Sequence, residues 1–182
     1  MIRVYVKEIE KKPTESRRTA ELRAIQMCVE AAGISDIISH FPSGEPYLKQ
    51  HPELKISVSH SHCFAAFAVG PVAEGLFGVD VEDASRKQLV KVASRFLMPD
   101  ELELAGLQKN GLAKAWTAKE AVYKASAIKN PDYKHGVCLS HDEFGQAETE
   151  DKEVFNLYFA ELEHNNILCV ACKGNKFEII TL

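Results

Sequence analysis

The chain contains 182 residues, of which 46% are hydrophobic and 8% aromatic, so disordered and fibrous classes are excluded. Its 22 Lys and Arg against 26 Asp and Glu give a formal charge of −4, which argues against a general nucleic-acid binder. No apolar run approaches the roughly 20 residues that span a bilayer, and residues 1–7 alternate like a strand and not like a signal peptide. We therefore expect a cytoplasmic protein without nucleic-acid or membrane partners.

The first part of the chain predicts a strand, a helix and two more strands. Residues 1–7 form the first strand, and a helix should begin at 11–14 and stop at Gly33. Its apolar positions recur at helical spacing: Leu22, Ile25, Val29 and Ala32. Alternation at 54–59 and the apolar run at 63–69 predict the next two strands. This order is typical of a helix packed on a sheet.

The second part repeats this plan in outline. A strand at 76–82 precedes a helix around 89–97, and another helix starts at Pro99 with acidic residues in its first turn. A further helix covers 116–128. Strands then follow, the last two joined as a hairpin through 173–176: 154–162, 167–172 and 177–182. We place the boundary between the two parts near Gly75.

Two short segments carry charged residues in a pattern that favours a metal site. In the strand of the second part, Asp80 and Glu82 are two residues apart and should point to the same face. In the last helix, Trp116, Glu120 and Lys124 recur every fourth residue and share one stripe. If that stripe faces the strand, three carboxylates and an ammonium converge. Such a set suits Mg²⁺ bound to phosphate oxygens.

Each part of this pattern also has a purely structural interpretation. Asp80 and Glu82 alone could form the solvent face of an edge strand. Glu120 and Lys124 could form a surface ion pair worth about 0.2–0.5 kcal/mol. Trp116 on the same stripe indicates instead that this helix face is covered.

The cysteines favour a reduced protein. Five cysteines are an odd and scattered set in a chain of this length. Cys169 and Cys172 are three apart on a predicted strand and so face opposite sides, which argues against a redox or zinc pair. We expect them to be core thiols.

These segments also resemble a known family. Gly-Val-Asp-Val-Glu at 78–82 and Trp-Thr-Ala-Lys-Glu-Ala-Val-Tyr-Lys at 116–124 are similar to the signature pair of the 4′-phosphopantetheinyl transferases. The resemblance is to the Sfp-like branch, in which one chain carries both halves of a pseudo-dimer. Three more stretches match in family order: Gly-Glu-Pro-Tyr-Leu at 44–48, Ser-His-Ser at 59–61 and Arg-Phe-Leu-Met-Pro-Asp-Glu at 95–101.

The resemblance implies an α+β fold of two pseudo-symmetric α/β halves, 1–75 and 76–182, with the active site in the cleft between them. It implies transfer of the 4′-phosphopantetheine arm of coenzyme A to a serine of an apo acyl- or peptidyl-carrier protein, with release of adenosine 3′,5′-bisphosphate. A monomer would suffice, because one chain supplies both halves. Two rival hypotheses are a non-catalytic coenzyme A or nucleotide-binding module on the same fold and an assembly partner of synthases without chemistry.

The resemblance also implies roles for residues of the second half. Asp80, Glu82 and Glu120 would hold Mg²⁺, and Glu120 would take the serine proton directly or through a bound water. Lys124, together with Lys119, would neutralise the α-phosphate side.

In the first half, His60 with Ser59 would hold the 3′-phosphate, and Arg18 would contact the nucleotide phosphate. A hydrogen-bonded structural histidine is the alternative for His60. Glu45 stands where the family usually has lysine, so a basic contact to coenzyme A is not expected there. Glu101 and Trp116 are second-tier candidates. Glu101 could instead be an acidic residue in the first turn of a helix, where it stabilises the helix dipole.

Overall fold

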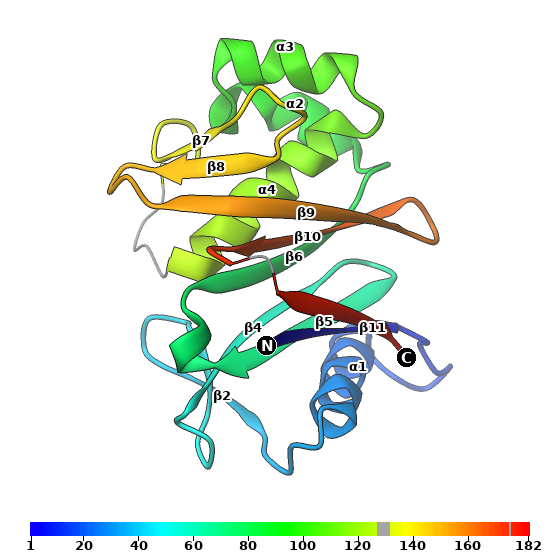
Figure 1. Cartoon of the computed structure of the whole chain (residues 1–182). Helices are drawn as coiled ribbons and strands as arrows, with labels where there is room; N and C mark the ends of the chain where they lie inside the picture. Colours follow the sequence, from blue (N-terminus) through cyan, green and yellow to red (C-terminus); the bar gives the residue numbers. More distant parts are fainter. Residues whose placement is uncertain (127–131, 175) are drawn as a thin grey trace.

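The computed structural model describes residues 1–126, 132–174 and 176–182. Its elements, drawn in Figure 1, confirm a mixed α+β fold: β1 (Ile2–Glu8), α1 (Arg17–Ala31), β2 (Ile38–His40), β3 (Pro46–Leu48), β4 (Leu54–His60), β5 (Phe64–Pro71), a 3₁₀ turn (Val72–Glu74), β6 (Phe77–Asp83), α2 (Lys87–Phe96), α3 (Pro99–Leu107), α4 (Gly111–Ser126), β7 (Val137–Leu139), β8 (Gln146–Thr149), β9 (Val154–Leu162), β10 (Asn166–Cys172) and β11 (Phe177–Thr181). Across these described stretches, no helix is long and apolar enough to cross a membrane.

The strands form two main sheets that pack face to face. The first sheet has the order β11-β1-β5-β4 and the second the order β6-β10-β9-β8-β7, while β2 and β3 form a separate small hairpin. Helix α1 packs on the first sheet, and α2, α3 and α4 lie over the second (Figure 1). Side chains of both sheets share one core between them: Val4 and Val6 of β1, Phe77, Val79 and Val81 of β6, and Leu168 and Val170 of β10. The layers therefore run helix, sheet, sheet, helix.

The predicted hairpin at the end of the chain is wrong. β10 pairs antiparallel with β6 and β9, whereas β11 crosses to the first sheet and runs parallel to β1. The chain bends at 173–174, but the edge of β1 decides the partner of β11. Residue 175 of the predicted turn lies outside the described part. The strands β7 and β8 were not predicted, because they are short and their alternation is weak.

Helix α1 begins later than predicted. Ser16 is its N-cap, and the Ser16 hydroxyl accepts a hydrogen bond from the Thr19 amide at 3.1 Å, so the helix starts at Arg17 and not at 11–14. Leu22, which we expected on the apolar face, is 57% exposed. The buried face is instead made mainly of small residues: Ala20, Ala24, Ile25, Cys28 and Val29. The predicted end of the last helix at residue 128 lies outside the described residues.

Cys169 and Cys172 are buried free thiols in β10, as predicted. Burial raises the pKa of Cys172 to about 11, which keeps this thiol protonated and unreactive at neutral pH.

Gly78 allows α4 to lie directly on β6. A Cβ atom at this position would lie 2.2 Å from the Ala121 carbonyl oxygen and 2.6 Å from the Ala125 nitrogen. Both atoms belong to the helix backbone, which cannot move aside as a flexible side chain can. The glycine therefore sets the distance at which the residues of α4 meet the strand that carries Asp80.

Replacing Gly78 with alanine should lower the free energy of unfolding by about 1–3 kcal/mol, because the helix must move off the strand. Urea unfolding measures the loss. Gly106→Ala in α3 is the matched control: no atom lies within 4 Å of its added Cβ, so it should be neutral or stabilising by up to about 1 kcal/mol. Equal stability of the two variants would mean that α4 and β6 are not in this close contact.

Candidate active site

The edge strands β4 and β6 of the two sheets meet along a seam of serine hydroxyls. The Ser57 hydroxyl accepts a hydrogen bond from the Val79 amide at 3.0 Å, and the Ser59 hydroxyl accepts one from the Val81 amide at 3.3 Å. Ser59 also donates to Asp80 Oδ1 at 2.7 Å. Because β6 is the edge of its sheet, these hydroxyls satisfy backbone amides that would otherwise need a neighbouring strand. The seam brings Ser59 of the first sheet to Asp80 of the second.

Asp80 and Glu82 share one face of β6, as the alternation predicted. The alternate residues of the strand point into the core between the sheets, which leaves the two carboxylates on the α4 side. Lys124 of α4 lies 2.7 Å from Asp80 Oδ1, the oxygen that also accepts from Ser59. Glu82 lies 2.6 Å from Arg86, at the start of α2. Both carboxylates are largely buried and paired with a cation.

Glu120 lies one helical turn before Lys124 on α4. Burial raises the pKa of the Glu120 carboxyl, and the negative charges of Asp80 and Glu82 act in the same direction, while Lys124 partly opposes them. Because Lys124 binds Asp80 and α4 packs along β6, the three carboxylates lie in one region of the protein. The structure thus brings the acidic residues of strand and helix together.

The carboxylate oxygens and the negative charge of this region suit Mg²⁺, which prefers oxygen ligands. A bound Mg²⁺ would also relieve the repulsion between Glu120 and the carboxylates of Asp80 and Glu82. Within residues 1–126, 132–174 and 176–182, however, no group of three potential ligands is arranged around a single point. Asp80 and Glu82 are turned to Lys124 and Arg86 instead. A cation at this site would compete with these two ion pairs.

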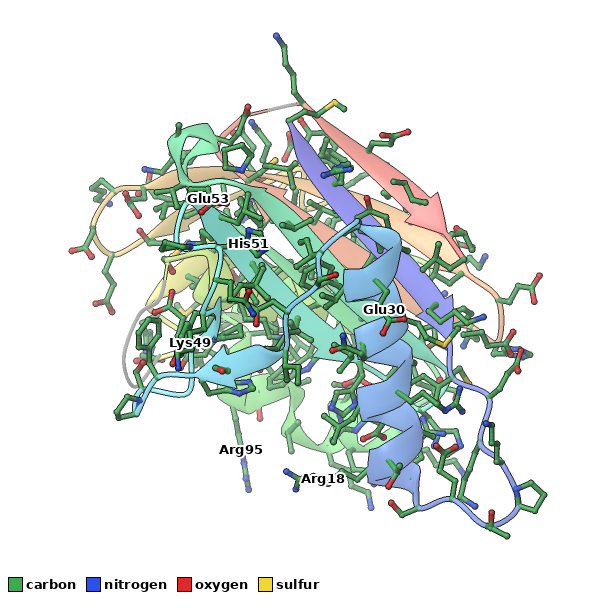
Figure 2. All side chains as sticks on the ribbon, turned by 90° about the horizontal axis from the view of Figure 1, so that it is seen from below. Arg18, Glu30, Lys49, His51, Glu53 and Arg95 are labelled. Atoms are coloured by element: carbon green, nitrogen blue, oxygen red, sulfur yellow. The ribbon has the colours of Figure 1, made fainter. Side chains whose placement is uncertain are left out.

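A cleft with a volume of about 1230 Å³ lies beside this region. Its walls come from α1, the β2–β3 hairpin, β4 and the last turn of α4, and each of these elements contributes one basic side chain to the lining: Arg18, His40, His60 and Lys124. Figure 2 shows Arg18 extending from the first turn of α1. His60 Nδ1 lies 3.7 Å from Glu21 Oε1, and Glu45 also lines the cleft. The cleft is large enough for an extended nucleotide-containing ligand.

Lys119 and Glu101 are not part of this cleft, and the structure does not bring Lys119 to a phosphate position. The Lys119 side chain is fully buried, with its ammonium 2.8 Å from Glu101 Oε2 and 2.8 Å from the Tyr133 carbonyl oxygen. Glu101 also accepts hydrogen bonds from the Met98 amide at 2.9 Å and the Leu139 amide at 2.8 Å. The pair ties α3 and β7 to α4, which corrects the expectation that Lys119 contacts coenzyme A.

Trp116 forms part of the wall around Glu120. Its ring packs edge-on against Phe96 with centroids 4.9 Å apart and lies 5.4 Å from the ring of Tyr133. The stripe of Trp116, Glu120 and Lys124 is partly covered, since all three residues are half-buried.

Sequence reasoning missed three residues next to the site. Arg86 binds Glu82, and Lys55 of β4 donates to the Ala125 carbonyl oxygen at 2.7 Å, where it holds the end of α4 against the first sheet. Tyr133 lies in the turn before β7 and packs on α4. None of them belongs to a periodic pattern, so no sequence signal marks them.

Comparison with known families decides the classification of this arrangement. A family model described as the 4′-phosphopantetheinyl transferase superfamily matches residues 76–172, a little over half of the chain. The chain belongs to this superfamily. The matched region contains Asp80, Glu82, Glu120 and Lys124, whereas His60 precedes it. A comparison with curated proteins found no match. Membership supports transfer of phosphopantetheine in general, and members of the superfamily generally use coenzyme A and Mg²⁺.

Proposed function

We propose that this member of the superfamily moves the 4′-phosphopantetheine arm of coenzyme A to a serine hydroxyl of an apo acyl- or peptidyl-carrier protein and releases adenosine 3′,5′-bisphosphate. One observation carries the proposal: Lys124 both lines the basic cleft and binds Asp80, at the point where Ser59 joins the two sheets. A ligand in the cleft would therefore place one end next to the acidic residues.

The cleft supports an orientation for coenzyme A. Arg18 and His60 at one part of the wall suit the 3′-phosphate and the nucleotide, since both side chains can donate charge-assisted hydrogen bonds. Lys124 at the other part suits the pyrophosphate. The carboxylate of Glu45 contributes negative charge to the wall, so the phosphates would lie away from the hairpin tip.

The acidic residues would act on the hydroxyl of the carrier. Glu120 has a carboxyl whose raised pKa lies closer to neutrality than that of an ordinary glutamate, which suits a general base. It would accept the proton as the serine oxygen attacks the phosphorus that bears the pantetheine arm. Lys124 would neutralise charge on the departing phosphate. Asp80, Glu82 and Glu120 would hold Mg²⁺, which supplies charge neutralisation for phosphoryl transfer when bound.

Mass spectrometry of apo-carriers incubated with the chain, coenzyme A and Mg²⁺ tests the proposal. We expect one or more of the fatty-acid, polyketide, peptide or lysine-pathway carriers to gain the mass of one phosphopantetheine group. No mass gain on any of them, together with measurable coenzyme A binding, would favour the rival hypothesis of a non-catalytic binding module.

Replacing His60 with alanine should weaken coenzyme A and reduce discrimination against dephospho-coenzyme A. Loss of one charge-assisted hydrogen bond to the 3′-phosphate costs about 1.5–3 kcal/mol, or roughly 10- to 150-fold in affinity. Calorimetric titration with both ligands measures the change. The matched control is His62→Ala, since His62 is exposed and lies outside this cleft. An unchanged preference between the two ligands in His60→Ala would exclude the proposed contact.

A monomer should be sufficient for activity, because Ser59, Asp80 and Lys124 meet within one chain. Specific activity should therefore stay constant as the protein is diluted, with light scattering recording its mass. Loss of activity in parallel with dissociation of an oligomer would contradict this expectation.

A further inference from the structure

The ring of Tyr133 lies across the face of α4 that carries Glu120. It packs 5.4 Å from the ring of Trp116 and 5.8 Å, edge-on, from the ring of Tyr123. Trp116 and Tyr123 are four residues before and three residues after Glu120, so all three share one face of the helix. A ring that contacts both neighbours must span the position between them. The Tyr133 ring therefore lies over the part of α4 from which Glu120 extends.

The backbone of Tyr133 is fixed by the buried ion pair described above. Its carbonyl oxygen accepts a hydrogen bond from the Lys119 ammonium, which Glu101 holds in place. Lys119 immediately precedes Glu120 in α4, so the helical turn that anchors the main chain of Tyr133 also carries Glu120. Tyr133 is thus held at both its backbone and its ring.

Glu120 needs a group that orients it. Lys124, one turn further along the helix, is bound to Asp80, and Arg86 is bound to Glu82. The Tyr133 ring, in contrast, packs against both Trp116 and Tyr123 on the face of α4 that carries Glu120, and the Tyr133 side chain opposes the rise in the pKa of the Glu120 carboxyl that burial causes. A hydroxyl can donate one hydrogen bond without adding a charge that would compete with a metal ion.

We propose that Tyr133 is a positioning residue whose hydroxyl donates a hydrogen bond to the Glu120 carboxylate and holds it towards Asp80 and the end of the cleft. This inference rests on the proposed function, since Glu120 is the proposed base. Tyr133 does not line the cleft, so it acts on the rate of transfer and not on the binding of coenzyme A.

Kinetics of Tyr133→Phe test the proposal, because phenylalanine keeps the ring packing and removes only the hydroxyl. We expect kcat to fall roughly tenfold, as for loss of one hydrogen bond to a charged group, with the KM for coenzyme A within about twofold of the wild-type value. Tyr158→Phe is the matched control: the Tyr158 ring packs 4.8 Å from Phe177, away from the acidic residues, and its loss of a hydroxyl should leave kcat unchanged. A Tyr133→Phe enzyme with wild-type kcat would overturn the proposal.

A second measurement tests the contact between the Tyr133 hydroxyl and the Glu120 carboxylate without an activity assay. Tyr133→Phe, Glu120→Ala and the double variant form a cycle of unfolding experiments in urea, and we expect the two single effects to be non-additive. Additive effects would mean that the hydroxyl and the carboxylate do not interact, which overturns the inference even if the enzyme is active. If the wild-type chain modifies no carrier, the proposed function fails, and the catalytic role of Tyr133 fails with it.

Discussion

Glu120→Gln should lower the rate of phosphopantetheine transfer by at least about 100-fold. The amide keeps the shape of the side chain but cannot accept the serine proton, and general-base catalysis is typically worth 10²- to 10⁴-fold. The substitution also removes one of the three charges proposed to hold Mg²⁺. Transfer to a carrier at saturating Mg²⁺ is the measurement. The control is Glu103→Gln, an exposed glutamate on α3. Near-wild-type turnover by Glu120→Gln would contradict the assignment.

The same variant should be more stable than the wild type in the absence of Mg²⁺. Burial first, and then Asp80 and Glu82, raise the pKa of Glu120 in the folded state, so folding favours its neutral form. The wild type therefore loses stability as the pH rises from the ordinary pKa of an unfolded glutamate through the raised folded value, and glutamine escapes this loss. The difference between the variants should be largest above both pKa values and should vanish below pH 4. Thermal unfolding at several pH values with a chelator present measures it.

Lys119→Met should destabilise the protein by about 3–5 kcal/mol, because it leaves the Glu101 carboxylate buried without a countercharge. Burial already lowers the pKa of Lys119, and the ion pair with Glu101 opposes that effect. Urea unfolding measures the loss, part of which should be recovered in the double variant Lys119→Met/Glu101→Gln. Lys109→Met provides the surface control: Lys109 is 73% exposed in its pair with Glu161, so its loss should cost at most about 1 kcal/mol.

The outcome separates two roles of Lys119. A structural lysine gives a less stable enzyme whose remaining folded fraction binds coenzyme A normally. A stable Lys119→Met protein with weakened coenzyme A binding would instead support the contact between Lys119 and a coenzyme A phosphate that the sequence resemblance implied.

Several features of the site follow from the sequence alone, because they depend only on the periodicity of a strand or a helix. The two-residue repeat of a strand places Asp80 and Glu82 on one face whatever surrounds them. The helical repeat places Glu120 and Lys124 on one stripe, and the tryptophan of that stripe indicates a covered face. The order of the motifs along the chain indicates the family, and the family match over 76–172 confirms it.

Other features were decided only by the tertiary structure. The crossing of β11 to β1, the seam formed by Ser57 and Ser59, and the pairing of Lys119 with Glu101 join residues that are distant in the sequence. No local pattern encodes these partners, since each depends on which strand edge or buried charge is left free when the layers come together. For that reason the sequence determined which side chains could serve phosphoryl transfer, and packing decided that Lys119 is buried against Glu101 and that the ring of Tyr133 lies against Trp116 and Tyr123 of α4.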